Sequence, residues 1–155
     1  MNYRVFRTIH DPALEKAWEY LQAGLEMTAF QQLAWNQMIE EEFQSNRLKK
    51  LAGQIRYFVL YRDDEPTVIA PLHIQKRSIA IGRYGYKRGI YFIGMKGYSD
   101  YLNFIYREFD QPAWEELHEI IVQETGFGCI MLLLYMRLPM PGLTIQDLGV
   151  KFAEC

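Results

Sequence analysis

Residues 57–74 read YFVLYRDDEPTVIAPLHI, and this stretch decides the fold. Two apolar runs, residues 57–61 and 67–74, flank the charged segment 62–65, which predicts two β-strands joined by a turn. The runs are almost entirely apolar instead of alternating with polar residues, which favours strands that are covered on both faces. Pro71 within the second run predicts an edge position or a bulge at that residue, because proline has no backbone N–H to donate to a ladder.

A third apolar run, residues 90–93, leads into a polar loop that ends Ser99-Asp100-Tyr101. Three glycines within residues 81–90 predict a tight connection or a short hairpin before this run. Residues 3–9 alternate moderately and predict a further strand near the N-terminus. The remaining segments have helical patterns and are expected to pack onto the sheet.

Two helices are expected between the first strand and the central pair. Asp11 followed by Pro12 predicts a helix start, since aspartate caps the first amides and proline needs no amide partner there. Thr28 with Gln31 resembles a capping box and predicts the second start. The acidic triplet 40–42 in the second helix is a metal or acid–base site or a solvated face, and the solvated face is favoured because consecutive helical residues point in different directions. The buried faces are predicted to contain Leu14, Ala17, Trp18 and Leu21 in the first helix, and Phe30, Leu33, Ala34, Met38 and Ile39 in the second.

A third helix is predicted to open at Asp110 and Pro112 and to close at Gly126, with Trp114, Leu117, Ile120 and Ile121 on its apolar face. Residues 128–136 then predict a last strand. The expected order is β-α-α-β-β-β-α-β, an α/β fold in which helices flank the sheet. A chain of 155 residues suits a single domain spanning residues 1–155.

Composition narrows the classes of partner. The formal net charge of -2 gives no basic field for a nucleic-acid backbone. No apolar run approaches the roughly 20 residues of a membrane helix, so no membrane partner is expected. The two cysteines, Cys129 and Cys155, lack ligand spacing and favour a reducing, cytoplasmic setting. Cys129 is interpreted as a buried hydrophobic residue in preference to a nucleophile, because its neighbours are apolar.

Residues 123–128, QETGFG, match the Q-x-x-G-x-G pyrophosphate loop of GNAT acetyltransferases. Such a loop needs to follow a strand and open a helix, so that amides and the helix dipole face the phosphates. Here the match closes a helix, and a helix stop is the favoured interpretation. The three histidines have no metal-ligand spacing, and no metal or cofactor site is predicted. These histidines are His10, His73 and His118, of which His73 is the candidate general base and is otherwise a packed strand residue.

The best site candidate is the loop segment Ser99-Asp100-Tyr101. It follows a strand at its C-terminal end, where open α/β sheets usually place ligands. Asp100 is the candidate catalytic residue, since a carboxylate among hydroxyls accepts a proton or orients an amine or hydroxyl acceptor. The alternative is a structural Asx turn or helix cap, with Tyr101 packed on the sheet.

Several short motifs carry a resemblance over residues 28–141. They are Phe30 with Trp35, Ala70-Pro71-Leu72, Phe92-Ile93-Gly94, Ser99-Asp100-Tyr101 and the closing strand 132–139. In these motifs the chain resembles the N-terminal half of CelD-like acyltransferases, a GNAT-fold family related to the FemAB aminoacyltransferases. The resemblance implies a GNAT-like mixed β-sheet and a second GNAT-like domain in which acyl-CoA or aminoacyl chemistry is concentrated. The chain departs from a cofactor-binding GNAT at residues 95–100, where Asp100 would repel a pyrophosphate.

The function expected from this resemblance is the acceptor-side or structural half of an acyltransferase. Acetyl-CoA or another acyl-CoA would serve the complete enzyme, and this chain alone is expected to lack a complete acyl-CoA site. Trp35, Ser99, Asp100 and Tyr101 are the expected contacts of a small-molecule amine or hydroxyl acceptor. The alternative is a non-catalytic interaction module that retains the fold and pairs as a homodimer or with another protein, motivated by the apolar strand 130–136.

Overall fold

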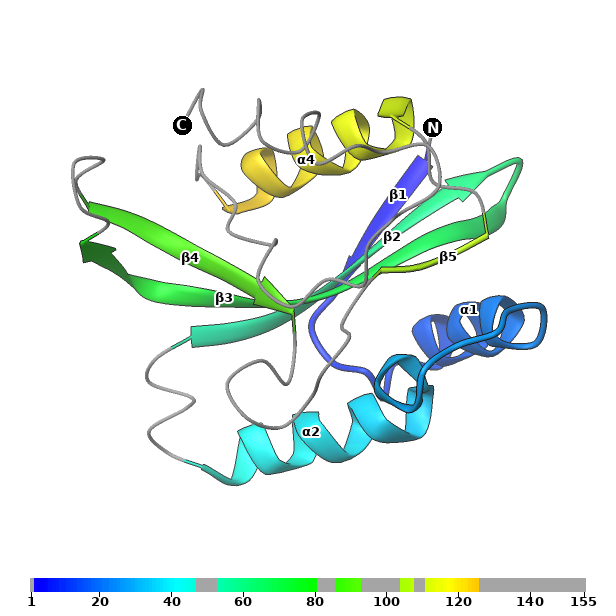
Figure 1. The fold of residues 1–155 in the computed structure, drawn as a ribbon, viewed down its shortest axis with the longest axis horizontal. Coiled ribbons are helices and arrows are strands. Elements are labelled where there is room, and N and C mark those ends of the chain that lie inside the picture. Colours follow the sequence, from blue (N-terminus) through cyan, green and yellow to red (C-terminus); the bar gives the residue numbers. More distant parts are fainter. Residues whose placement is uncertain (1, 47–52, 81–85, 93–103, 108–110, 126–155) are drawn as a thin grey trace.

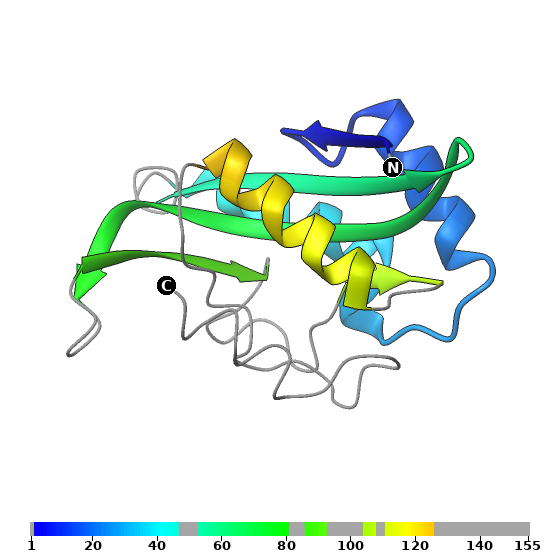
Figure 2. The same cartoon turned by 90° about the horizontal axis from the view of Figure 1, so that it is seen from above.

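The computed structural model describes residues 2–46, 53–80, 86–92, 104–107 and 111–125. An antiparallel sheet forms the middle layer, with α1 and α2 on one face and α4 on the other (Figure 1). Seen from above, α4 lies across the strands β2 and β3 (Figure 2). In chain order the elements are β1 (Asn2–Phe6), α1 (Pro12–Gln22), the 3₁₀ turn η1 (Ala29–Gln31), α2 (Leu33–Ser45), β2 (Gly53–Arg62), β3 (Glu65–Ala80), β4 (Tyr86–Phe92), β5 (Ile105–Tyr106) and α4 (Gln111–Thr125).

The predicted central hairpin is confirmed. β2 and β3 pair antiparallel, and Arg62 lies opposite Glu65. The two residues between them, Asp63 and Asp64, have φ angles of 51° and 63°. Left-handed conformations at both central positions are typical of a type I′ turn, whose twist matches that of the flanking strands, and aspartate tolerates them better than most residues.

The prediction that these strands are covered on both faces is also confirmed. Phe58 and Leu60 belong to a core under α4, whereas Tyr57 and Val59 belong to a second core under α1 and α2. Successive strand residues point to opposite faces, so an unbroken apolar run fills both cores at once. The helix faces expected in α1 and α4 are buried as predicted, and Asp11 caps α1 by accepting from the Ala13 amide at 2.9 Å.

The predicted face of α2 is partly wrong, since Ile39 is buried as expected but other members of the face are not. Ala34 and Met38 are exposed, Met38 by 48%, and Glu40 of the acidic triplet is buried. The cause lies in the capping box of Thr28 and Gln31, which caps η1 instead of α2. Gln32 is then extended, and α2 begins afresh at Leu33 with a different phase. Its buried residues are Asn36, Ile39, Glu40 and Phe43.

The prediction for Pro71 needs correction. β3 is an inner strand, and its register shifts lie at Leu60/Tyr61 and Ile74/Ser78, away from Pro71. Pro71 pairs with Tyr57 of β2. On its other edge β3 changes partner near Pro71, so the missing N–H falls where the described ladder is interrupted.

The expected element order holds from β1 to α4, and β5 is an unpredicted addition. All described strand pairings are antiparallel. A mixed sheet needs a parallel neighbour, and the expected strand 128–136 lies outside the described residues. In the described part of the chain, no helix combines the length and the hydropathy of a membrane span.

Candidate functional site

The candidate site lies along one edge of β3, where the two described strands β4 and β5 pair in succession. Leu72 of β3 pairs with Phe92 at the end of β4, and Ile69 pairs with Ile105 at the start of β5. β2 occupies the opposite edge of β3 throughout this region, so β4 and β5 follow one another along the same edge. Between β4 and β5, the described residues provide no ladder partner on this edge for residues 70–71 of β3. We call this stretch of β3, about 10 Å from Ile69 to Leu72 at the usual rise per strand residue, the edge gap.

The sequence-predicted acceptor residues belong to the segment that joins these two strands. Ser99, Asp100 and Tyr101 lie outside the described residues. The described residues that bound the segment are Phe92 and Phe104, and both adjoin the edge gap. Phe104 is fully buried and packs beside Trp114 of α4, with ring centroids 6.1 Å apart. The described residues on either side of the segment, Phe92 and Phe104, therefore lie beside the edge gap.

Trp35, the fourth predicted site residue, is described and lies on α2. Its half-buried ring meets Phe30 edge-on, with centroids 5.2 Å apart. Phe30 packs against the core under α4, whereas Trp35 packs against the core under α1 and α2. Because the sheet separates the two cores, this contact passes around an edge of the sheet.

The edge around which the contact passes is the one that carries β5. The Gln31 side chain donates to the Phe104 carbonyl oxygen at 3.0 Å and accepts from the Thr28 amide at 3.1 Å. Trp18 of α1 donates its indole N–H to the Gln31 carbonyl at 3.1 Å, which fixes η1 from the other side. Trp35 and Phe104 are thus both connected to η1, Trp35 through Phe30 and Phe104 through Gln31.

A buried polar cluster lies on the opposite side of α2 from Trp35. Glu40, 2% exposed, accepts hydrogen bonds from the Thr8 hydroxyl at 2.7 Å, the Ile9 amide at 2.8 Å and the Tyr57 hydroxyl at 2.5 Å. Burial first, and then the Glu40 charge, raises the pKa of the Tyr57 hydroxyl far above its ordinary value. The cluster joins α2, β2 and the β1–α1 connection, and its closed surroundings indicate a structural role.

This cluster corrects the prediction that the whole acidic triplet is solvated. Glu41 is exposed, and its carboxylate lies 3.9 Å from the His10 ring. The sequence-based preference was wrong for Glu40 because the chain turns extended at Gln32 and rotates the helix. Tyr57, which donates its hydroxyl to Glu40, lies in an apolar strand run. A buried tyrosine hydroxyl usually needs a hydrogen-bond acceptor, and this was a weak sequence signal for a buried polar partner.

The histidines occupy separate surroundings. His10 is exposed beside Glu15 and Glu41, His73 lies edge-on to Phe43 at 5.1 Å, and His118 lies beside Trp114 at 6.0 Å. Over the described ranges, no three residues among His, Cys, Asp and Glu are grouped to hold a metal ion.

Residues 123–125 of the Q-x-x-G-x-G match are described, and residues 126–128 lie outside the described residues. α4 runs through Thr125, so Gln123–Thr125 forms its last turn. Glu124 lies there and accepts from the Tyr3 hydroxyl at 3.1 Å. A phosphate at this helix end would meet carbonyl oxygens and a carboxylate, so the described residues do not fit the group.

Comparison with known proteins finds no matching family model, no matching curated protein and no matching solved structure.

Proposed function

We propose that this chain is a GNAT-like domain that forms the acceptor-side half of an acyltransferase. The observation that carries the proposal is the arrangement of the described elements. Their order up to α4 agrees with the expected GNAT-like order, and α1 and α2 cover one face while α4 covers the other. A small-molecule amine or hydroxyl is the proposed acceptor, and a second GNAT-like domain or a homodimer partner is the proposed source of the donor site.

The edge gap supports an acceptor site at this place. The proposed contacts Ser99, Asp100 and Tyr101 belong to the segment between Phe92 and Phe104, and the Phe104 carbonyl oxygen accepts a hydrogen bond from Gln31 of η1. Binding residues are often carried by a loop whose ends are held by a rigid scaffold. Trp35 supplies an aromatic surface on the neighbouring helix.

The proposed chemistry assigns one proton transfer to this half. In acyl transfer, the acceptor nitrogen or oxygen bonds to the acyl carbon, the bond to the donor thiolate breaks, and the acceptor proton leaves. Asp100 is the proposed proton acceptor, and Ser99 and Tyr101 orient the acceptor by hydrogen bonds. Acyl-CoA, when bound by the complete enzyme, supplies the activated acyl group. The donor site is proposed to belong to the partner domain.

Tryptophan fluorescence tests the acceptor site. Trp18 and Trp114 are 0% and 1% exposed, so Trp35 is the tryptophan that a ligand at the edge gap would reach. A panel of small amines and alcohols should contain a compound that changes the emission saturably. The emission change should disappear in Trp35→Phe, and the affinity for the compound should fall at least tenfold in Asp100→Asn. Asp63→Asn, a distant surface control, should bind the compound with the affinity of the parent.

Two results would overturn the proposal. Saturable micromolar binding of acetyl-CoA to this chain in calorimetry would contradict an acceptor-only half. An Asp100→Asn variant that binds the panel compounds as tightly as the parent would contradict the assigned contacts. Circular dichroism melting of each variant identifies one that has merely lost its fold.

A further inference from the structure

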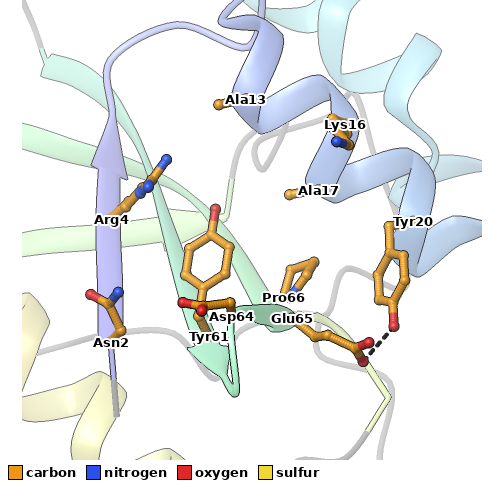
Figure 3. A pocket seen from close by; sticks show the side chains of 10 residues that line it. All are labelled: Asn2, Arg4, Ala13, Lys16, Ala17, Tyr20, Tyr61, Asp64, Glu65 and Pro66. Carbon is orange, nitrogen blue, oxygen red and sulfur yellow. Dashed lines mark hydrogen bonds between the residues drawn. The ribbon is translucent and has the colours of Figure 1, made fainter.

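A second hollow lies away from the edge gap, between β1, α1 and the β2–β3 turn (Figure 3). Its volume is about 530 Å³, within the range usual for small-molecule sites. Neither Trp35 nor η1 contributes to it. We call it the turn pocket, and its lining residues are Asn2, Arg4, Ala13, Lys16, Ala17, Tyr20, Tyr61, Asp64, Glu65 and Pro66.

Charges of opposite sign line different parts of the turn pocket. The cations Arg4 and Lys16 come from β1 and α1, whereas the carboxylates Asp64 and Glu65 come from the β2–β3 turn (Figure 3). Among the described residues, neither Lys16 nor Asp64 makes an ion pair. The pocket therefore offers the Lys16 ammonium and the Asp64 carboxylate as charges that no described ion pair neutralises.

Part of the rim is held in place by its own contacts. The Tyr20 hydroxyl donates to Glu65 at 2.6 Å, and Arg107 donates to that hydroxyl and to the Tyr20 carbonyl, each at 3.0 Å. The Arg107 guanidinium also lies over the Tyr20 ring, 4.2 Å from its centroid. These contacts engage Glu65 and leave Asp64 as the available carboxylate.

Between the charges the pocket is apolar. Ala13 and Ala17 of α1 present only methyl groups, which leaves the space that a larger side chain would fill, and Pro66 adds a hydrocarbon surface. The Tyr61 ring stands on the β1 side, with the Arg4 guanidinium 5.7 Å from its centroid. A ligand suited to this lining has charged ends and an apolar middle.

We propose that the turn pocket binds a small zwitterion, with its carboxylate at Arg4 and Lys16 and its ammonium at Asp64. A simple anion would face the turn carboxylates, and a simple cation would face Arg4 and Lys16, so each would gain less than a compound with both charges. Amino acids, ω-amino acids and dipeptides share this chemistry and differ in the separation of their charges. The proposal is independent of acyl transfer.

Titration of the full chain, followed by amide NMR, tests the proposal with glycine, 6-aminohexanoate and alanyl-alanine as probes. At least one zwitterion should shift the amides of residues 13–20 and 61–66 saturably, and the preferred probe identifies the charge separation. Its N-acetylated and C-amidated forms, which each lack one charge, should bind at least tenfold more weakly. The proposal would be overturned if either blocked form bound as tightly as the parent probe. It would also be overturned if no probe gave a saturable shift at 10 mM, roughly the weak limit of a specific small-ligand site.

Matched variants locate the interaction. Asp64→Asn and Lys16→Gln should each weaken binding at least fivefold. Asp63→Asn removes a charge from the same turn and the same backbone conformation, but Asp63 does not line the turn pocket, so its binding should be unchanged. Arg7→Gln is the corresponding control for the cation. If either control variant lowered the affinity as much as the variant it is matched to, the effect would be one of general charge. That result would refute the site.

Discussion

Removing the Glu40 carboxylate is expected to be among the most damaging single changes in this protein. Two of its three donors, the Ile9 amide and the Tyr57 hydroxyl, are buried with it. Glu40→Ala would leave both without their acceptor, and a buried unsatisfied donor costs about 1–3 kcal/mol. Taking about 2 kcal/mol for each donor predicts a loss of about 4 kcal/mol. A domain of this size has a total stability of roughly 5–15 kcal/mol, so the loss is a large part of it.

Urea denaturation measures this loss directly, and two further variants divide it. Glu40→Gln keeps the volume and one acceptor oxygen but turns an NH₂ group toward the donors, so it should cost about half as much as alanine. Tyr57→Phe removes one donor together with its need for a partner and should cost about 1 kcal/mol. Glu41→Ala, a change at the neighbouring exposed residue, should stay within about 0.5 kcal/mol.

The combination of Glu40→Gln with Tyr57→Phe gives the coupling between the two side chains. Residues that share a buried hydrogen bond couple by about 0.5–3 kcal/mol. If Glu40→Ala lowers the free energy of unfolding by less than about 1 kcal/mol, the effect is no larger than that of an average point mutation. That result would refute the structural role assigned to Glu40. A coupling near zero would refute the direct bond to Tyr57.

Three further predictions address other parts of the molecule. Burial and the Glu40 charge raise the pKa of Tyr57, so above pH about 10 the unfolded state releases this proton while the folded state keeps it, and the free energy of unfolding falls by up to about 1.4 kcal/mol per pH unit. The urea midpoint should therefore fall less steeply between pH 9 and 11 in Tyr57→Phe than in the parent. An equal slope in the two proteins would contradict this prediction. Gly53→Ala would place a Cβ 2.0 Å from His73 Nε2 and 2.7 Å from the Ile74 carbonyl oxygen, so we expect a loss of about 1–3 kcal/mol and a lower melting temperature. A melting temperature equal to the parent would show that β2 and β3 yield freely at this point. Asp64→Gly should stabilise the hairpin by about 0.5–1 kcal/mol, since glycine adopts φ of 63° without strain; a lower melting temperature would contradict the type I′ assignment.

The parts of the fold that sequence predicted well are those where one local signal suffices. The apolar runs on either side of residues 62–65 specified the hairpin, and the Asp11-Pro12 pair specified the start of α1. β5 has only two residues, Ile105–Tyr106, and no period-two pattern is recognisable over so short a segment. The phase of α2 failed because one extended residue, Gln32, separates the capping box from the helix.

The sites were harder to predict, because side chains distant in the sequence create them. Glu40 becomes buried only when β2 brings Tyr57 and the β1–α1 connection brings Ile9 to the same place. The turn pocket likewise needs Lys16 of α1 and Asp64 of the hairpin to face one hollow. Most charged residues are exposed, and a sequence alone does not distinguish the few buried charged residues from the solvated ones. Neither set of site residues therefore carries a local pattern. The site roles of Trp35, Ser99, Asp100 and Tyr101 all stay predictions.

The division of one sheet edge between β4 and β5 has a consequence for how this architecture can vary. Each half of that edge is fixed to β3 by its own pairs, Phe92 with Leu72 and Ile105 with Ile69. Lengthening the chain between them would leave both attachments intact, and each doubling of a flexible loop costs only about 0.6 kcal/mol. Related chains could therefore exchange this insert for longer or shorter ones and acquire new specificities while the sheet stays the same.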